Sequence, residues 1–467
     1  MLPKRSIALA LSFLLVALTA ACGSRLSDQE RALAIAGAGV AGPAVDGTGA
    51  PTDGSGGETA GEASGEESAN GGTIVTGGAG RDASGGTGGT SSGATCTPGS
   101  ATSIGVTPTE IKVGNVSQIT GLVPGFAQTS VNGVKAYFNM INSQGGVCGR
   151  KLTLLTADDR FQSATNRAET EKMAGQAVAL VGDLSVVDDG GAPIIDEKGI
   201  ADFSLATTAP RIAAQNNYSP NPIDPTPDAG NGLVGILNYF KSTDNISKPA
   251  IFYQDVATGA NQANSYKKDF ERAGIPVVAT YPVAPTATNF NTQANDMKQK
   301  GVDFVITVAE VNAMSNLAKA FQSVGYFPKV PFYGAQVYGQ KFLQLAGAAA
   351  EGTRVGLIFA IPEERTNAAT QQLAAWYART APGADLDFFS VVAWLAADMF
   401  VTALRATGSD PTQAKIIAEA KKFTNYTGDG LVGGINSAQK RQPKCFNVIE
   451  VKNGKWVKTF PAKGFQC

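Results

Sequence analysis

The segment Thr109–Asp159, TEIKVGNVSQITGLVPGFAQTSVNGVKAYFNMINSQGGVCGRKLTLLTADD, reads as strand, helix, strand. A short β-branched run at 111–113 is followed by a loop that contains Gly121, Pro124 and Gly125. Apolar residues then recur at steps of three and four across 131–141, which is the spacing of one helix face. A second apolar run at 152–155 ends at two aspartates. Strand, helix and strand within about fifty residues form a βαβ unit, which predicts a parallel sheet with right-handed crossovers.

The same alternation continues to the C-terminus and predicts an α/β protein. Expected strands are 177–182, 250–253, 277–280, 304–308 and one that ends at 332–334; expected helices are 164–176, 261–273, 289–300, 316–324, 371–377 and 391–406. The proline-rich segment 216–228 looks like a crossover between lobes. The final segment, 446–460, is expected to be a β-hairpin, because Asn453-Gly454 favours a type I′ turn.

Composition excludes several classes of function. At 467 residues the chain is too long for one ordinary core, and its net charge of −1 argues against nucleic acid as the main partner. The absence of histidine removes the commonest general base and the usual zinc ligand. Gly428–Gly433 fits G-x-G-x-x-G, but no strand leads into it and no helix follows it. We therefore expect no enzyme activity, no cofactor and no metal.

The N-terminus has the features of an export signal. Lys4 and Arg5 precede an apolar core at 7–18, which is too short to span a bilayer as a mature helix. The sequence that ends at Cys22 resembles a bacterial lipobox, although Thr19 stands where leucine is usual. We expect Cys22 to be lipidated; the alternative is an ordinary cleaved signal peptide with a chance cysteine. Residues 23–100 are rich in glycine and serine and are expected to form a disordered tether.

Four further cysteines are expected to form two disulfides in an exported protein. Cys96 precedes the first strand and Cys148 precedes the second, so both lie at the same edge of the predicted sheet. Cys445 and Cys467 flank the predicted hairpin and its tail. Of the three possible pairings, we predict Cys96–Cys148 and Cys445–Cys467.

Several motifs resemble those of a known family. They are GVTPTEIKVG at 105–114, NSQGGVCGRKL at 142–152 closing on Asp158-Asp159, TNF at 288–290 and GVDFV at 301–305. Together they resemble the type I periplasmic binding proteins, the extracytoplasmic solute receptors of branched-chain amino acid and related ABC importers. The resemblance covers roughly 103–460. It implies two doubly wound parallel-sheet lobes joined by a multi-crossing hinge and preceded by the disordered tether.

The expected domain organisation follows from this resemblance. The predicted segments are a lipoprotein signal peptide at 1–22, the linker at 23–100, lobe 1 at 101–225 and 361–430, and lobe 2 at 226–360 with its C-terminal hairpin at 431–467.

The expected ligand contacts lie in loops after the strands, where open α/β sheets bind ligands. On lobe 1 we expect contacts from Phe126, Ser185, Ala206, Thr207 and Thr208. The resemblance implies that Phe126 offers a ring wall and that the loops at Ser185 and at 206–208 hold the ligand's carboxylate or an equivalent acceptor. An equal alternative is that Thr207 and Thr208 cap a helix near Pro210. Asp158-Asp159 is expected to order its loop rather than to bind a metal, because adjacent strand residues point to opposite faces.

On lobe 2 the expected contacts are Thr258, Glu310, Gln336 and Tyr338. Thr258 replaces the aromatic residue that the family often has in this loop. Gln336 is neutral where amino-acid-binding members often have an acidic residue, so the usual partner of an α-ammonium group is missing. Glu310 is the candidate substitute; otherwise the ligand is not an amino acid.

The sequence thus predicts a monomeric solute-binding lipoprotein on the outer face of the bacterial cytoplasmic membrane. It would capture a small polar or amphipathic ligand, such as an amino acid or amide, and deliver it to an ABC transporter permease. The alternative is a ligand-sensing surface receptor that works with a signalling partner.

Overall fold

The computed structural model describes residues 96, 99, 102–121, 125, 127–226, 232–365 and 367–467. The predicted signal peptide, Cys22, Phe126 and nearly all of the predicted tether lie outside the described residues.

The opening βαβ unit is confirmed. Strand β1 (Glu110–Ser117) pairs in parallel with β2 (Lys151–Asp158), in register from Glu110 opposite Lys151 to Ser117 opposite Asp158. Helix α2 (Gln128–Ser143) connects them and buries the apolar face that the sequence predicts. Burial of that face fixes the helix on the sheet, since packing supplies most of the stability of a helix in a protein.

The first sheet has four parallel strands in the order β2-β1-β3-β4. β3 (Ala179–Val181) and β4 (Ala201–Phe203) are fully buried and apolar apart from Asp202. The connecting helices are α3 (Ser163–Ala174), α4 (Ala192–Lys198) and α5 (Ala209–Ala213). A parallel order with helical connections places the loops after β3 and β4 at one edge of the sheet.

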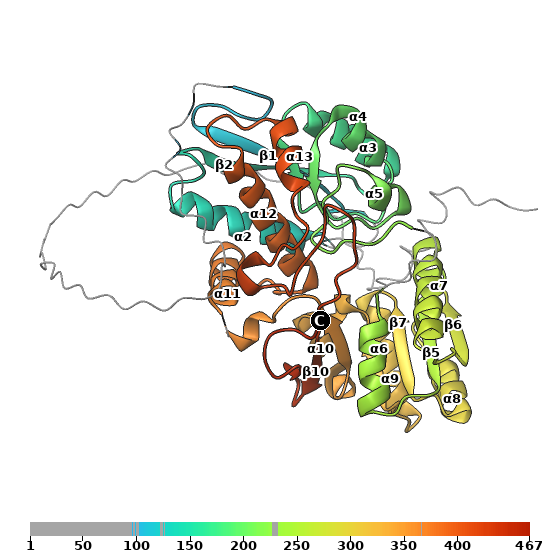
Figure 1. Cartoon of the computed structure of the whole chain (residues 1–467). Coiled ribbons are helices and arrows are strands. Elements are labelled where there is room, and N and C mark those ends of the chain that lie inside the picture. Colours follow the sequence, from blue (N-terminus) through green and yellow to red (C-terminus); the bar gives the residue numbers. More distant parts are fainter. Residues whose placement is uncertain are drawn as a thin grey trace, which may run out of the picture. The chain divides into compact units, whose positions relative to one another are not determined.

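The second sheet has seven strands in the order β11-β10-β9-β8-β7-β5-β6. Its strands β5 to β9 are parallel and are β5 (Pro249–Gln254), β6 (Ala279–Val283), β7 (Phe304–Val308), β8 (Val330–Tyr333) and β9 (Arg354–Leu357). The helices around it are α6 (Val234–Thr243), α7 (Ala257–Arg272), α8 (Asn291–Lys300), α9 (Val311–Ser323) and α10 (Gln340–Ala346). α7 packs against β5 and β7 (Figure 1).

The predicted C-terminal hairpin is confirmed. β10 (Asn447–Lys452) and β11 (Lys455–Phe460) are antiparallel, and β10 also pairs with β9. At the turn, Asn453 has φ 53° and Gly454 has φ 68°. Positive φ at both central residues is the requirement of a type I′ turn.

The chain returns to the first sheet after β9. Helix α12 (Phe388–Ala406) packs beside α2, where Tyr137 and Trp394 lie edge to face with ring centroids 4.9 Å apart. α11 (Ala368–Thr380) also contacts α2, and α13 (Gln413–Ala420) contacts β4, before the chain crosses again to β10 (Figure 1). With the passage from β4 to β5, this makes three crossings between the sheets, as the family resemblance implies. The lobe boundaries themselves stay a prediction.

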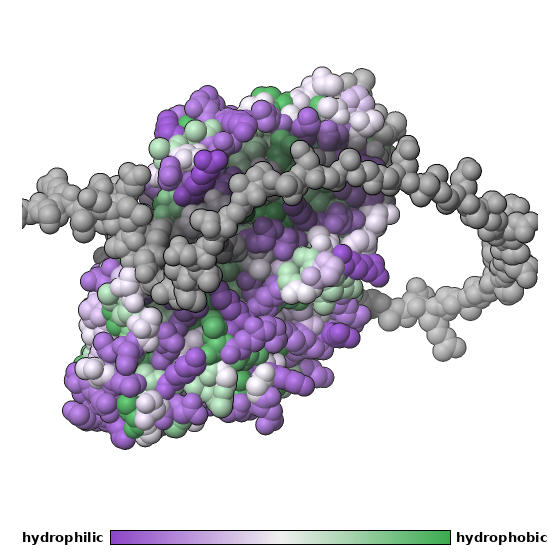
Figure 2. Space-filling view, turned by 180° about the vertical axis from the view of Figure 1, so that it is seen from behind, coloured by the Kyte–Doolittle hydropathy of each residue, from purple (hydrophilic) through white to green (hydrophobic). Residues whose placement is uncertain are grey.

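Helix α12 is long and apolar enough to cross a membrane, but most of it is buried inside the protein. A core helix is expected to be apolar on all sides. In the space-filling view, hydrophilic residues cover most of the visible surface and apolar residues form smaller patches (Figure 2). The apolar stretches of the described residues therefore belong mainly to the interior.

Several element boundaries differ from the prediction by a few residues, and α7 begins at Ala257 rather than at 261. α9 begins at Val311 rather than near 316, because its N-cap is Glu310, whose side chain accepts hydrogen bonds from the amides of Asn312 and Ala313. Glutamate is outside the usual set of N-cap residues, so the start was missed. β6 spans Ala279–Val283 rather than 277–280. Short one-turn helices are also present: η1 (Ala335–Val337), η2 (Gly347–Ala350), η3 (Pro362–Glu364) and η4 (Gly428–Gly430).

Both predicted disulfides are confirmed. Cys96 and Cys148 are joined with Cα atoms 5.3 Å apart, and Cys445 and Cys467 with Cα atoms 4.0 Å apart. The first pairing follows from the parallel sheet, because segments that precede neighbouring parallel strands meet at one edge.

Candidate ligand-binding site

A cavity of about 490 Å³ lies where the carboxyl ends of strands from both sheets meet the crossing segments. Leu184 and Val186 follow β3, and Leu205 to Thr207 follow β4. From the second sheet come the ends of β5, β7 and β8 and the residues after them. The volume falls within the range of small-molecule sites.

The cavity lining is mostly apolar. Branched and aromatic side chains from both sheets face it, among them Leu205, Ile306 and Phe332. Its charged lining residues are Glu310 and Lys444. Apolar walls with few polar groups are typical of sites that orient a ligand through a small number of contacts.

The loop after β4 is tied to the loop after β3 by Asp188. The backbone amide of Thr207 donates to one carboxylate oxygen at 2.8 Å, and the amide of Thr208 donates to the other at 3.0 Å. The Thr208 hydroxyl also donates to Asp188. The Thr207 hydroxyl donates to the carbonyl of Ser185 at 2.6 Å. The polar groups expected to face a ligand are therefore engaged within the protein.

The alternative role as a helix cap holds for the position of Thr208 but not for its side chain. Thr208 is the N-cap of α5, but its side chain makes no capping hydrogen bond. The Thr208 hydroxyl instead donates a hydrogen bond to Asp188.

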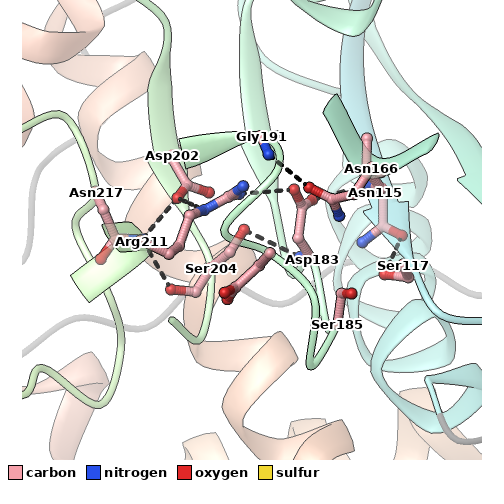
Figure 3. A network of polar contacts seen from close by, with 12 residues as sticks. Asn115, Ser117, Asn166, Asp183, Ser185, Gly191, Asp202, Ser204, Arg211 and Asn217 are labelled. Carbon is pink, nitrogen blue, oxygen red and sulfur yellow. Dashed lines mark hydrogen bonds and ion pairs between the residues drawn. The ribbon is translucent and has the colours of Figure 1, made fainter. Parts of the chain in front are cut away.

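A buried ionic cluster underlies these two loops (Figure 3). Arg211 donates from Nε to Asp202 at 2.8 Å and from Nη2 to Asp183 at 2.9 Å, and all three side chains are at most 5% exposed. Asp183 also accepts from the amide of Val116, and its own amide donates to the Ser204 hydroxyl. The cluster links β1, the ends of β3 and β4, and α5, and so fixes the loops that line the cavity.

The cluster has more carboxyl groups than cationic groups. Burial raises the pKa of Asp183 to about 7, with a further rise from Asp202 and an opposing effect of Arg211. Burial also raises the pKa of Asp188. An ionised carboxyl group is disfavoured when it loses water and has a like charge beside it. Protonation of Asp183 therefore relieves the excess negative charge around Arg211.

On the side of the second sheet, Glu310 and Gln336 are also engaged. Glu310 Oε1 accepts from the amide of Ala313 at 2.6 Å, and Oε2 accepts from the amide of Asn312 at 2.8 Å. Gln336 donates from its side-chain amide to the carbonyl of Ala309 at 3.0 Å. These bonds fix the start of α9 and the loop after β8.

The predicted contact residues divide into three groups. Those that line the cavity are Ala206, Thr207, Thr258, Glu310 and Gln336. Ser185, Thr208 and Tyr338 lie behind the lining; the Ser185 hydroxyl accepts from the amide of Val187, and the Tyr338 hydroxyl donates to Glu363. Phe126 is outside the described residues. Their roles in ligand binding stay predictions.

The expectation for Asp158-Asp159 is confirmed. Asp158 accepts from the amides of Ile119 and Thr120, and Asp159 accepts from the amide of Phe161 and from the Asn166 side chain. The two carboxylates therefore order the loops after β1 and β2.

Sequence reasoning missed Asp188, Arg211 and Lys444. Asp188 precedes Asp189-Gly190-Gly191, and this composition is typical of a turn. In turns, an aspartate side chain often accepts hydrogen bonds from nearby backbone amides. Arg211 is the only cationic residue between Lys198 and Lys241, in a segment rich in apolar residues. That isolation was a usable signal of a buried ion pair. Lys444 offered a weaker signal, its position beside Cys445.

Comparison with known proteins assigns the family. The model of the periplasmic binding protein family matches residues 110–455. The chain therefore belongs to the periplasmic binding proteins, and its two sheets with three crossings give it the type I fold. Family members are extracytoplasmic binding proteins.

Individual similarities are distant. A fatty acid ABC transporter substrate-binding protein from Thermomonospora curvata is 19% identical, with a TM-score of 0.65 over 78% of this chain and 94% of that one. A branched-chain amino acid transporter substrate binding protein from Streptococcus pneumoniae, in complex with isoleucine, is 18% identical, with a TM-score of 0.63 over 75% of this chain and 100% of that one. At these identities the structures show the shared fold.

Among curated proteins, Leu/Ile/Val-binding protein homolog 3 from Brucella melitensis is 22% identical over 170 residues. The matched region spans 36% of this chain and 45% of that relative, which is less than half of its length. The proteins matched are substrate-binding proteins rather than enzymes.

Proposed function

We propose that this protein is a solute-binding lipoprotein that captures a small amphipathic ligand in the cavity between its two sheets and delivers it to an ABC transporter permease. The observation that carries the proposal is the lining of the cavity by loops from the carboxyl ends of strands in both sheets. A ligand that contacts both sets of loops favours a closed arrangement of the two lobes, because only that arrangement provides all of its contacts.

The three crossing segments support a closing motion. The crossing before β10 is held to the crossing after β4 by Ser437, which donates to the carbonyl of Ser219, and by Lys440, which donates to the carbonyl of Asn217. Because the crossing segments are bonded to each other, the lobes would move by hinge closure. In such a motion, a few residues between rigid elements change their backbone conformation.

Ligand capture is tested by a thermal-shift screen of the purified protein against amino acids, amides, fatty acids and aromatic acids. A ligand that binds only the folded state raises the melting temperature in a concentration-dependent way. Delivery is then tested by uptake of the labelled ligand in cells with and without the gene. Equal uptake in the two strains would contradict a role in import.

Membrane attachment is proposed to occur through lipid on Cys22. Metabolic labelling with a fatty-acid probe should tag the wild-type protein and lose the tag in Cys22→Ala. Equal labelling of both proteins would contradict the anchor and leave ligand capture unaffected.

A further inference from the structure

A zwitterionic amino acid in the cavity would need a partner for each of its charges, because an unpaired buried ion is strongly unfavourable. On the first-sheet side, the donors suited to a carboxylate are the amides of Thr207 and Thr208 and the Thr208 hydroxyl. All three already donate to Asp188, which is 3% exposed. An internal carboxylate thus occupies the donors that a ligand carboxylate would need, and its charge opposes a second anion there.

On the second-sheet side, the anion suited to an ammonium group is Glu310. Both of its oxygens accept hydrogen bonds from the first turn of α9, including a third from the Asn312 side chain at 2.7 Å. The positive end of this 13-residue helix offsets the charge of Glu310. Gln336, the other polar side chain in this position, is neutral. Glu310 is therefore a structural cap rather than an open partner for an ammonium group.

Lys444 differs from both of these groups. It is the other charged residue of the lining; it lies at the exposed edge of the cavity, and its amino group has no ion pair or hydrogen bond with the described residues. Its neighbours Pro443 and Phe446 line the same cavity and are apolar. A cation beside apolar walls favours a ligand with one negative charge and a hydrocarbon body.

Tyr333 is a further polar residue of the lining. It lies at the end of β8 and is 1% exposed. Its hydroxyl is buried and has no hydrogen-bond partner among the described residues. Buried polar groups are normally paired, but this hydroxyl is shielded from the cavity space, so the choice of ligand rests on Lys444, Asp188 and Glu310.

We propose that the cavity binds an apolar monocarboxylate, a fatty or aromatic acid without an ammonium group, whose carboxylate pairs with Lys444. This inference rests on the proposed function and specifies its ligand class. Asp188 then takes the donors that the carboxylate of an amino acid would need, and the first turn of α9 takes the acceptors of Glu310 that its ammonium group would need, so the cavity selects against amino acids.

The test is isothermal titration of the mature full chain with matched pairs of probes: octanoate and octanamide, benzoate and benzamide, and leucine. Each amide keeps the hydrocarbon body and removes the charge. We expect at least one acid to bind ten times more tightly than its amide and more tightly than leucine. Lys444→Gln should remove that preference by weakening only the acid.

Lys455→Gln is the matched control, since Lys455 is an exposed residue of β11 that does not line the cavity. It should leave every affinity unchanged. Leucine binding more tightly than both acids, or an acid preference that survives in Lys444→Gln, overturns the ligand class while leaving ligand capture intact. Failure of the five probes and of every solute in the thermal screen overturns both proposals.

Discussion

The two sheets are stabilised by different kinds of interaction. Beside the four-stranded sheet, Arg211 lies between Asp183 and Asp202 in a buried ionic cluster. In the seven-stranded sheet, the ring of Phe304 lies 5.8 Å from that of Phe240 and 5.6 Å from that of Phe332. A buried charge needs a partner of opposite charge, whereas a buried ring packs against several neighbours. We therefore expect the loss of one partner to lower the free energy of unfolding much more in the first region than in the second.

The largest effect is expected from Arg211→Ala. This substitution leaves two buried carboxyl groups without their cation, and breaking a buried pair in this way typically costs about 3–5 kcal/mol. Urea unfolding measures the change. The control is Arg441→Ala, because the Arg441 side chain is 64% exposed where it pairs with Asp224. Exposed pairs contribute about 0–1 kcal/mol, so equal losses in the two variants would contradict the importance of the cluster.

A smaller loss, about 2 kcal/mol, is expected from Phe304→Leu, because part of a buried ring is removed and its neighbours can partly fill the space. Phe304 is fully buried, whereas Phe327 is 65% exposed. Phe327→Leu should therefore change the free energy of unfolding by less than about 0.5 kcal/mol. A loss for Phe304→Leu as large as that for Arg211→Ala would erase the proposed difference between the two regions.

The pH dependence of stability should separate the regions further. The pKa of Asp183 is raised from its ordinary value of 3.8 to about 7 in the folded protein, mainly by burial. Between these values the folded state binds more protons than the unfolded state, so stability falls as the pH rises. The stabilising contribution is complete below about pH 4 and is lost as the pH passes through about 7.

The measurement compares wild type with Asp183→Asn in urea unfolding from pH 4 to pH 8. Subtracting the two curves isolates Asp183 from the other carboxyl groups. We expect the wild type to lose stability relative to Asp183→Asn as the pH rises. A difference that is constant across this range would show that Asp183 does not titrate there.

The smallest effect is expected from Glu310→Gln. Loss of an N-cap lowers stability by about 1 kcal/mol, while monocarboxylate affinity should change by less than threefold. Thr412→Ala is a matched control, since Thr412 caps α13 by accepting from the amide of Lys415 and does not line the cavity. The two variants should behave alike. A tenfold loss of ligand affinity in Glu310→Gln alone would instead support pairing with a ligand ammonium group.

Local pattern explains why most elements were predictable. The strand at 304–308 was predicted with the bounds that the structure gives, because an apolar run between a glycine and a helix is typical of a buried parallel strand. The first disulfide was predictable because the order of strand, helix and strand determines which loops share an edge. The start of α9 was not predictable, since its cap is a residue type that rarely has that role.

The surroundings of the predicted ligand contacts could not be derived from the sequence, because they depend on partners that are distant in sequence. Serine and threonine after parallel strands correctly indicated the loops around the cavity. They did not indicate whether their donors were open. Asp188 lies 20 residues before Thr208, and no periodicity connects the two.

The sequence by itself determined the alternation of strands and helices, the family, the two disulfides and the edge of each sheet at which a ligand would bind. These follow from short-range spacing and from the fixed handedness of parallel connections. Only the tertiary structure placed Arg211 between two aspartates, put Asp188 on the donors of Thr207 and Thr208, and brought Lys444 to a cavity also lined by Leu205. Pairing of buried charges depends on distances of a few ångströms between residues far apart in the chain, and folding alone sets those distances.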